Sequence, residues 1–373
     1  MNAEPGPMEA DERRTEPPRP VVDGGDGADR RLAHWAEHGR RIDWIEPYVR
    51  VVTEDFNPRA PVIRWYEGGT LNVAYNCLDR FAALDPDRPA LFWDALDPAG
   101  SRAWSRAELL ADVSRFANVL KAHDVVRGDR VLLYLPTCPE AVVAMLAAAR
   151  IGAVHVAVFT GYSGRALAAR MRDCGARVVV TADAVVADDG LDPLKAKVDE
   201  AAAIAGCIDK VLVARRAGIA VPMARRRDVF LDEVVDAVAD RCPPAEVGAE
   251  HPLFLSYTTG VSGRPKGLVH VSGGFLVQAA QTLEEVFGAG PGDVVWCTAD
   301  VAHIAAHAYG IYGPLANGAA TVIAERADRG GTAERHAAVA RRWGVTVYYT
   351  SPGLARDLAA CREGPGAGAV AAL

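Results

Sequence analysis

The chain has 373 residues, of which 50% are hydrophobic and 24% charged, so it has the composition of a folded globular protein. This length suits one large domain or two ordinary ones. The formal net charge of −7 is unlike that of nucleic-acid-binding proteins, which usually carry a basic face, so we expect no nucleic-acid partner.

The cysteines and the N-terminus indicate the cellular compartment. The seven cysteines contain no Cys-x-x-Cys pair, and the N-terminus lacks the apolar core of a signal peptide. We therefore expect reduced cysteines and a cytoplasmic protein.

The N-terminal part of the chain divides into two segments of different composition. Residues 1–30 are rich in Pro, Gly, Asp, Glu and Arg and have few large apolar groups, which predicts a disordered tail. Residues 31–90 are rich in Trp, Tyr, Asn and Pro with weak periodicity, which favours a subdomain that wraps around a core. We assign the core to residues 91–361 and a flexible Gly-rich end to residues 362–373.

From about residue 90, short β-branched runs alternate with longer Ala- and Leu-rich helical patterns. This alternation predicts an α/β fold with mainly parallel sheets and crossover helices. The predicted strands are residues 131–134, 154–158, 178–181, 211–214, 253–257, 294–297, 320–323 and 345–349. The predicted helices are residues 106–123, 139–150, 164–174, 194–205, 274–287, 333–343 and 354–361.

One apolar stretch, residues 141–159, is long enough to be tested as a membrane span. Arg150 and His155 interrupt it, and Gly152 divides it into an Ala-rich half and a Val-rich half. We therefore predict a buried helix followed by a buried strand, and no membrane partner.

The segment after the predicted strand 253–257 has the residue types of a phosphate-binding loop. Its glycines allow close approach of backbone amides to an anion, its hydroxyls can donate hydrogen bonds, and its lysine supplies a cation. The predicted phosphate ligands are Thr258, Thr259, Gly260, Ser262, Gly263, Lys266 and Gly267. The alternative is a polar, glycine-rich loop between a strand and a helix. A P-loop phosphotransferase is a weak hypothesis, because Pro265 stands where the Walker A motif has its second glycine.

Four segments in order resemble one family. Residues 257–267, Tyr-Thr-Thr-Gly-Val-Ser-Gly-Arg-Pro-Lys-Gly, resemble the phosphate-binding signature of the AMP-forming acyl-CoA synthetase superfamily. Residues 65–80, Trp-Tyr-Glu-Gly-Gly-Thr-Leu-Asn-Val-Ala-Tyr-Asn-Cys-Leu-Asp-Arg, are similar to a string of acetyl- and propionyl-CoA synthetases, where we expect a structural role. Residues 131–155 and 292–319 also resemble acetyl-CoA synthetases. The resemblance covers about residues 31–356 and identifies residues 91–361 as a partial AMP-binding core of the adenylate-forming fold.

The resemblance implies a reaction and its reactants. A carboxylate, acetate or another short-chain acid, attacks the α-phosphate of ATP and expels Mg²⁺-bound pyrophosphate, and coenzyme A then attacks the mixed anhydride. The loop would hold the β- and γ-phosphates as charge develops on the leaving group, and Lys266 is the best candidate for a direct contact.

Two departures from the family pattern concern coenzyme A. Acetyl-CoA synthetases place basic residues against the coenzyme A phosphate where this chain has Asp188 and Asp189, which would repel it. The alternative is that this surface loop is simply variable. Thr346 replaces an Asn that often lies near coenzyme A in the family.

A third departure lies in the segment that resembles the acyl pocket. The family has Gly-Trp-Val-Thr-Gly-His where this chain has Ala302-His303-Ile304-Ala305-Ala306-His307, so His303 replaces Trp and Ala305 replaces Thr. His303 and His307 are four residues apart, but Ile304 stands where zinc enzymes of the His-Glu-x-x-His type have Glu, so we predict no metal site.

The sequence ends at Leu373, before the adenine, ribose and hinge segments and the C-terminal domain with the adenylation lysine that the resemblance implies. We therefore expect a fold that is incomplete at the C-terminus and a chain that is inactive by itself, with a complementary C-terminal half as partner. The alternative is a non-catalytic remnant or interaction module that keeps a phosphate-binding loop. Unpaired strand edges also predict poor solubility of the isolated chain.

Overall fold

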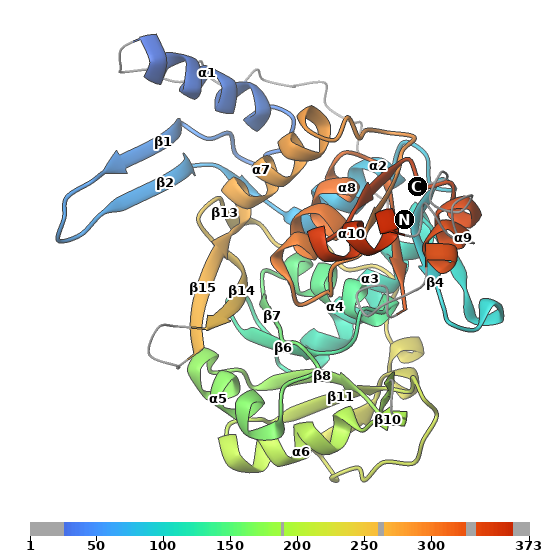
Figure 1. Cartoon of the computed structure of the whole chain (residues 1–373). Coiled ribbons are helices and arrows are strands. Elements are labelled where there is room, and N and C mark those ends of the chain that lie inside the picture. Colours follow the sequence, from blue (N-terminus) through green and yellow to red (C-terminus); the bar gives the residue numbers. More distant parts are fainter. Residues whose placement is uncertain (1–25, 188–189, 260–264, 326–332, 361–373) are drawn as a thin grey trace, which may run out of the picture.

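A computed structural model of the chain describes residues 26–187, 190–259, 265–325 and 333–360 (Figure 1). Its largest sheet has seven strands in the order β12-β11-β8-β6-β7-β14-β15, parallel except for the last pair. These strands are β12 (Asp228–Phe230), β11 (Lys210–Ala214), β8 (Val178–Ala182), β6 (Arg130–Tyr134), β7 (Val154–Ala157), β14 (Pro252–Thr259) and β15 (Pro265–Val271).

A second sheet has five strands in the order β18-β16-β17-β4-β5, with only the β4–β5 pair antiparallel. They are β18 (Val347–Tyr349), β16 (Val294–Cys297), β17 (Ala320–Ala324), β4 (Pro89–Asp94) and β5 (Arg102–Ser105). The longer helices that follow residue 100 are α3 (Arg106–Ala122), α4 (Pro139–Arg150), α5 (Gly164–Cys174), α6 (Leu194–Ala205), α7 (Ser272–Glu285), α9 (Ala333–Trp343) and α10 (Pro352–Ala360). Helices α5 and α6 pack together beside the seven-stranded sheet (Figure 1).

The predicted α/β class and every predicted strand and helix from residue 106 onward are confirmed, with differences only at element ends. Strand β6 shows why the prediction works: from Val131 to Tyr134 each side chain is at most 2% exposed, as in a strand covered on both faces. Helix α3 begins at a capping box, in which Ser105 and Glu108 each accept a hydrogen bond from the other's backbone amide.

Several elements were not predicted. The N-terminal region contains α1 (Asp26–Gly39) and the antiparallel pair β1 (Arg50–Asp55) and β2 (Val62–Glu67), which projects from the body (Figure 1). The other elements that were not predicted are short strands, short helical turns and π-helical segments. They are β3 (Thr70–Leu71), η1 (Tyr75–Asp79), α2 (Arg80–Ala82), η2 (Pro98–Gly100), β9 (Val185–Ala187), β10 (Gly190–Asp192), η3 (Leu231–Glu233), η4 (Val235–Ala237), β13 (Val247–Gly248), η5 (Ala306–Tyr312) and α8 (Gly313–Ala316).

The predicted segment boundaries are placed as follows. The predicted tail, residues 1–30, lies outside the described residues except for its last five, which belong to α1. The boundary predicted at residue 90 falls inside β4. The predicted flexible end, residues 362–373, lies outside the described residues.

The string at residues 65–80 anchors the N-terminal region to the core. The buried side-chain amide of Asn72 donates hydrogen bonds to the carbonyl oxygens of Ala149, Arg150 and Ala245 at 3.1, 3.0 and 2.7 Å. The guanidinium of Arg150 donates to both carboxylate oxygens of Asp79 at 2.7 and 2.9 Å. These contacts give the string the structural role expected for it.

The apolar stretch 141–159 is the predicted helix and strand, α4 and β7, joined by a turn at Gly152 with φ of 70°. In the portion of the chain that the structure describes, no helix has the length and apolar character needed to cross a membrane.

Candidate functional site

The predicted phosphate loop joins the two strands of a β-hairpin. Strand β14 pairs with β15 in antiparallel register, with Thr258 opposite Lys266 and Thr259 opposite Pro265. The sequence suggested a loop that leads from a strand to a helix, whereas β15 comes between the loop and α7. The turn of the hairpin follows the carboxyl end of β14. In a parallel sheet this is the edge at which α/β proteins bind ligands. Gly260, Ser262 and Gly263 lie outside the described residues.

Two predicted phosphate ligands present side chains to solvent at this hairpin end. Thr258 and Lys266 are both exposed, and among the described residues the Lys266 ammonium group has no ion-pair partner. At Gly267, an added Cβ would contact the Tyr257 ring at 3.4 Å, an ordinary van der Waals distance. Packing within the described residues therefore does not require glycine at position 267, and its role in anion approach stays a prediction.

Helix α5 contacts the hairpin close to its turn, at Tyr257. The Tyr257 hydroxyl donates to the carboxylate of Asp173 at 2.6 Å. Burial, followed by this hydrogen bond, raises the pKa of Tyr257 above its usual value, so the phenol stays a donor at neutral pH. On the same helix, the Arg170 guanidinium lies 5.6 Å from the centre of the Tyr257 ring. These contacts attach strand β14 to helix α5.

Three histidines, the buried His155 and His307 and the half-buried His270, lie around Phe254 on β14. We call this group the histidine cluster. The Phe254 ring centroid is 4.4 Å from those of His270 and His307 and 5.3 Å from that of His155. Through Phe254 and His270 the cluster links the segment at 303–307 to the phosphate hairpin.

Burial keeps these imidazoles neutral at pH 7. It lowers the pKa of His307 to about 4 and that of His155 well below its usual value, and it also lowers the pKa of His270. His155 Nε2 is 2.7 Å from the Tyr312 hydroxyl, and His270 Nε2 is 3.1 Å from Ser256 Oγ. The cluster is therefore a packed, uncharged group that includes one hairpin residue, His270 of β15.

The predicted acyl segment starts a helical turn. His303 and Ile304 are exposed, whereas Ala305 and His307 are buried. The Ala305 amide donates to His303 Nδ1 at 3.1 Å, and His307 Nδ1 is 3.1 Å from the His303 carbonyl oxygen. Within the described residues His303 and His307 belong to no group of three potential metal ligands.

Thr346 does not join this segment. Its hydroxyl donates to Asp293 at 2.9 Å and accepts from the Val294 amide at 3.0 Å, so it lies at the amino end of β16. His303 follows the carboxyl end of that strand. Of the loop expected near coenzyme A, Ala187 ends β9 and Gly190 begins β10, while Asp188 and Asp189 lie outside the described residues.

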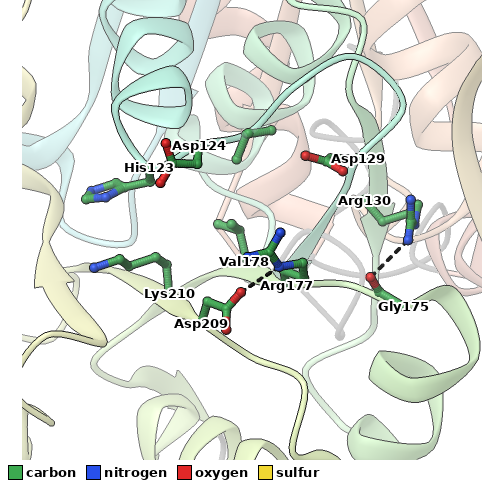
Figure 2. Close-up of a pocket in the computed structure, with 10 residues that line it drawn as sticks. His123, Asp124, Asp129, Arg130, Gly175, Arg177, Val178, Asp209 and Lys210 are labelled. Carbon is green, nitrogen blue, oxygen red and sulfur yellow. Dashed lines mark hydrogen bonds and ion pairs between the residues drawn. The ribbon is translucent and has the colours of Figure 1, made fainter.

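A small charged pocket of about 90 Å³ lies at the other end of the seven-stranded sheet (Figure 2). Arg130, Val178 and Lys210, at the amino ends of β6, β8 and β11, help to line it. Its cations are already bonded: Arg130 donates to the Gly175 carbonyl at 3.1 Å and Arg177 pairs with Asp209 at 2.5 Å. The pocket faces away from the hairpin end, and we do not assign the chemistry to it.

The histidine cluster was missed in the sequence, although one signal was readable. His155 interrupts an otherwise apolar strand, Val154-His155-Val156-Ala157, and a polar residue in a strand buried on both faces needs a specific partner. His307 is in the segment 292–319 and His270 comes three residues after the segment 257–267, but nothing in their spacing predicts that they meet.

Comparison with known proteins shows which family the chain belongs to. The family model described as AMP-binding enzyme matches residues 78–372. The chain belongs to the AMP-binding enzyme family. A second family model, the acetyl-coenzyme A synthetase N-terminus, matches residues 28–77, so the two models together match residues 28–372.

Individual relatives place the chain beside acetyl-CoA synthetases. It is 47% identical over 335 residues to acetyl-coenzyme A synthetase of Methylobacterium radiotolerans, covering 89% of this chain and 52% of the relative. It is 43% identical over 337 residues to acetyl-coenzyme A synthetase 1 of Pseudomonas aeruginosa, covering 90% and 52%. The solved structure of acetoacetyl-CoA synthetase from Streptomyces lividans matches with a TM-score of 0.80 and 26% identity, covering 92% of this chain and 52% of that one. The chain thus spans about half the length of these AMP-binding relatives.

Proposed function

We propose that the chain is the N-terminal, phosphate-holding part of an acid–thiol ligase that converts acetate or another short-chain acid, ATP and coenzyme A into acyl-CoA, AMP and pyrophosphate. The observation that carries the proposal is the β14–β15 hairpin, which presents Thr258 and Lys266 at the carboxyl edge of the sheet. The matched family and the acetyl-CoA synthetase relatives support it.

The reaction has two group transfers. A carboxylate oxygen forms a bond to the α-phosphorus of ATP while the bond to pyrophosphate breaks. The coenzyme A sulfur then attacks the carbonyl carbon, its proton is released, and AMP leaves. Neither transfer needs a covalent bond to the protein, so the demand on this chain is positioning and stabilisation of charge.

The residues at the hairpin end meet that demand in part. Lys266 can contact the β- and γ-phosphates, and the hydroxyls of Thr258, Thr259 and Ser262 can donate to phosphate oxygens. An exposed ion pair at about 4 Å contributes roughly 1 kcal/mol in water, more once ATP and the rest of the site exclude solvent. The carboxylate of Asp173, beside the hairpin, accepts a hydrogen bond from Tyr257, so we assign it no role as a Mg²⁺ ligand. Mg²⁺ would instead enter the site bound to the ATP phosphates.

We further propose that a complementary C-terminal half completes the site, within the cytoplasm. The chain spans about half of its relatives, and β15 forms one edge of the seven-stranded sheet with Leu268 and Val269 41% and 56% exposed. An edge strand with exposed apolar side chains is suited to association with further polypeptide. The described cysteines are all free, which fits a reducing compartment.

The second candidate function is a non-catalytic remnant or interaction module that keeps the phosphate hairpin. The observation that favours it is the pair of departures at the expected acyl segment, where His303 and Ala305 replace the family's Trp and Thr. Such a module would bind a partner through the exposed edge of the seven-stranded sheet. It would not activate a carboxylate, either by itself or together with a C-terminal half.

Acetate-dependent exchange of pyrophosphate into ATP distinguishes the two. We expect no exchange from the isolated chain, and exchange after addition of a C-terminal half cut from the Methylobacterium radiotolerans relative. In that mixture Lys266→Ala should lower exchange at least about tenfold, the effect of losing 1.4 kcal/mol of transition-state stabilisation. The control is Lys121→Ala, an exposed lysine on α3, which should leave exchange unchanged.

Two results would contradict the proposal in different ways. Exchange by the isolated chain that Lys266→Ala abolishes would refute the need for a C-terminal half. A mixture that forms a stable complex on size-exclusion chromatography but exchanges no pyrophosphate with any short-chain acid would favour the interaction module.

A further inference from the structure

Two histidines of α1 and one glutamate of α7 meet at a contact between the N-terminal region and the core (Figure 1). His38 Nε2 is 2.7 Å from one carboxylate oxygen of Glu285, and His34 Nε2 is 3.9 Å from the other. The two imidazole rings lie 4.5 Å apart, centroid to centroid. The potential ligand atoms of the three residues all lie within 4.8 Å of one another.

The donor set suits a divalent transition metal. Two imidazole nitrogens and one carboxylate are a known three-ligand set for zinc, with a water as fourth ligand. Bonds of about 2.0–2.1 Å in a tetrahedron place ligand atoms roughly 3.3 Å apart. The two distances from histidine nitrogen to carboxylate oxygen, 2.7 and 3.9 Å, lie on either side of that value, so binding would widen one and narrow the other by about 0.6 Å.

The local sequence has a zinc-binding spacing. Residues His34-Trp35-Ala36-Glu37-His38 follow the His-x-x-Glu-His pattern, in which two histidines one helical turn apart bind zinc. Helix α1 places both histidines on the side that faces α7, where Glu285 supplies the third ligand. Glu37 is exposed, and we assign it no role.

The surroundings leave one side of the group open. The His38 side chain is only 6% exposed, whereas those of His34 and Glu285 are 40% and 41% exposed. A metal ion and its water could therefore enter from solvent. Gln281 donates to one oxygen of Glu285 at 2.5 Å, which orients the carboxylate as partner groups of metal ligands do.

The simpler interpretation is an ion pair between His38 and Glu285 that fastens α1 to α7. That pair accounts for the 2.7 Å contact but gives no role to His34, which lies beside the same carboxylate at 3.9 Å, beyond hydrogen-bond distance. A metal ion in place of the proton between His38 and Glu285 would be bound by all three residues.

We propose that His34, His38 and Glu285 form a binding site for a divalent transition metal, Zn²⁺ in particular, that clamps helix α1 to helix α7. The site is separate from the phosphate hairpin and does not depend on the proposed ligase activity.

Zinc binding to the purified full chain tests the proposal, with a chromogenic chelator as competitor and Co²⁺ absorption as a reporter of tetrahedral geometry. We expect the wild type to bind one equivalent more tightly than His34→Ala or Glu285→Gln, by at least tenfold. His34→Ala removes a side chain that is 40% exposed, so the fold should survive, and Glu285→Gln keeps an amide oxygen for the contact with His38. The control is His123→Ala, a histidine of the pocket in Figure 2.

Limited proteolysis provides a second measurement, which does not depend on the number of zinc ions bound. Zinc should slow proteolytic cleavage within α1 in the wild type but not in His34→Ala. The proposal is overturned if wild type, His34→Ala and Glu285→Gln bind zinc with equal affinity and number, or if His123→Ala loses as much binding as they do. Weak binding by the wild type that is equal for all variants would identify an adventitious ion only.

Discussion

The histidine cluster predicts a specific acid sensitivity of the fold. His307 is 1% exposed, and burial lowers its pKa to about 4, whereas a histidine in an unfolded chain titrates near 6.5. Because the folded pKa is the lower one, the unfolded state binds more protons between these values. Stability is therefore full above about pH 6.5 and is lost as the pH falls toward 4.

The size of the effect follows from these two pKa values. Between pH 7.5 and pH 5 the linkage relation gives a loss of about 2 kcal/mol from His307 alone. Carboxylates contribute little over this range because their pKa values lie below it. Replacing His307 with glutamine removes the titrating group while keeping a polar side chain near the His303 carbonyl.

Urea unfolding followed by circular dichroism at pH 7.5 and pH 5.0 measures the effect. The difference in unfolding free energy between the two pH values should be about 2 kcal/mol smaller in His307→Gln than in the wild type. His303→Gln, at an exposed histidine four residues earlier, should retain the wild-type difference. Equal differences in all three proteins would refute the argument, because they would show that burial of His307 does not exclude its proton.

Three other substitutions test the packing that positions the site. Asn72→Ala should cost about 1–3 kcal/mol in urea unfolding, because it removes the buried amide that donates to the carbonyl oxygens of Ala149, Arg150 and Ala245. Asp79→Ala should cost about 3–5 kcal/mol by the same measurement, since it leaves the buried guanidinium of Arg150 unpaired; a cost below 1 kcal/mol would show that solvent reaches it. Gly313→Ala places a Cβ 2.4 Å from the Ala308 carbonyl oxygen and should lower thermal stability, whereas Gly290→Ala, where no atom lies within 4 Å, should leave it near the wild-type value.

The parallel strands and their helices could be predicted because they carry their own evidence. Val131-Leu132-Leu133-Tyr134 is apolar on both faces, as in a strand buried on both sides. Helix α4 starts at Pro139 and ends before Gly152, so the residues that favour a helix start and a helix end stand where its apolar composition begins and ends. The family resemblance added the order of the segments, which composition alone does not give.

The hairpin strand β15 was harder to predict. Its run begins with Pro265 and Gly267, both disfavoured in strand interiors, and its pairing with β14 comes from an antiparallel turn at an edge. The pair β1–β2 was missed for a related reason: Arg50, Glu54 and Asp55 give it no alternation of apolar and polar residues.

The histidine cluster and the contact between α1 and α7 could not be predicted from local pattern. His155, His270 and His307 come from three separate elements, and Glu285 comes 247 residues after His38 in a chain of 373. Contacts between residues this far apart in the sequence depend on tertiary packing. The spacing of His34 and His38 was visible in the sequence, but without Glu285 it indicates only two neighbouring residues on a helix.

The anchoring of the N-terminal region has a consequence for how the chain is made. The guanidinium of Arg80 donates to the carbonyl oxygen of Ala316, 236 residues later, and β4 pairs with β17. At translation rates of about 5–20 residues per second, the ribosome needs roughly 10–50 s to supply these partners. During that interval the nascent chain holds β4 with a vacant edge, which makes it a client for chaperones that cover apolar strands before the second half of the sheet emerges.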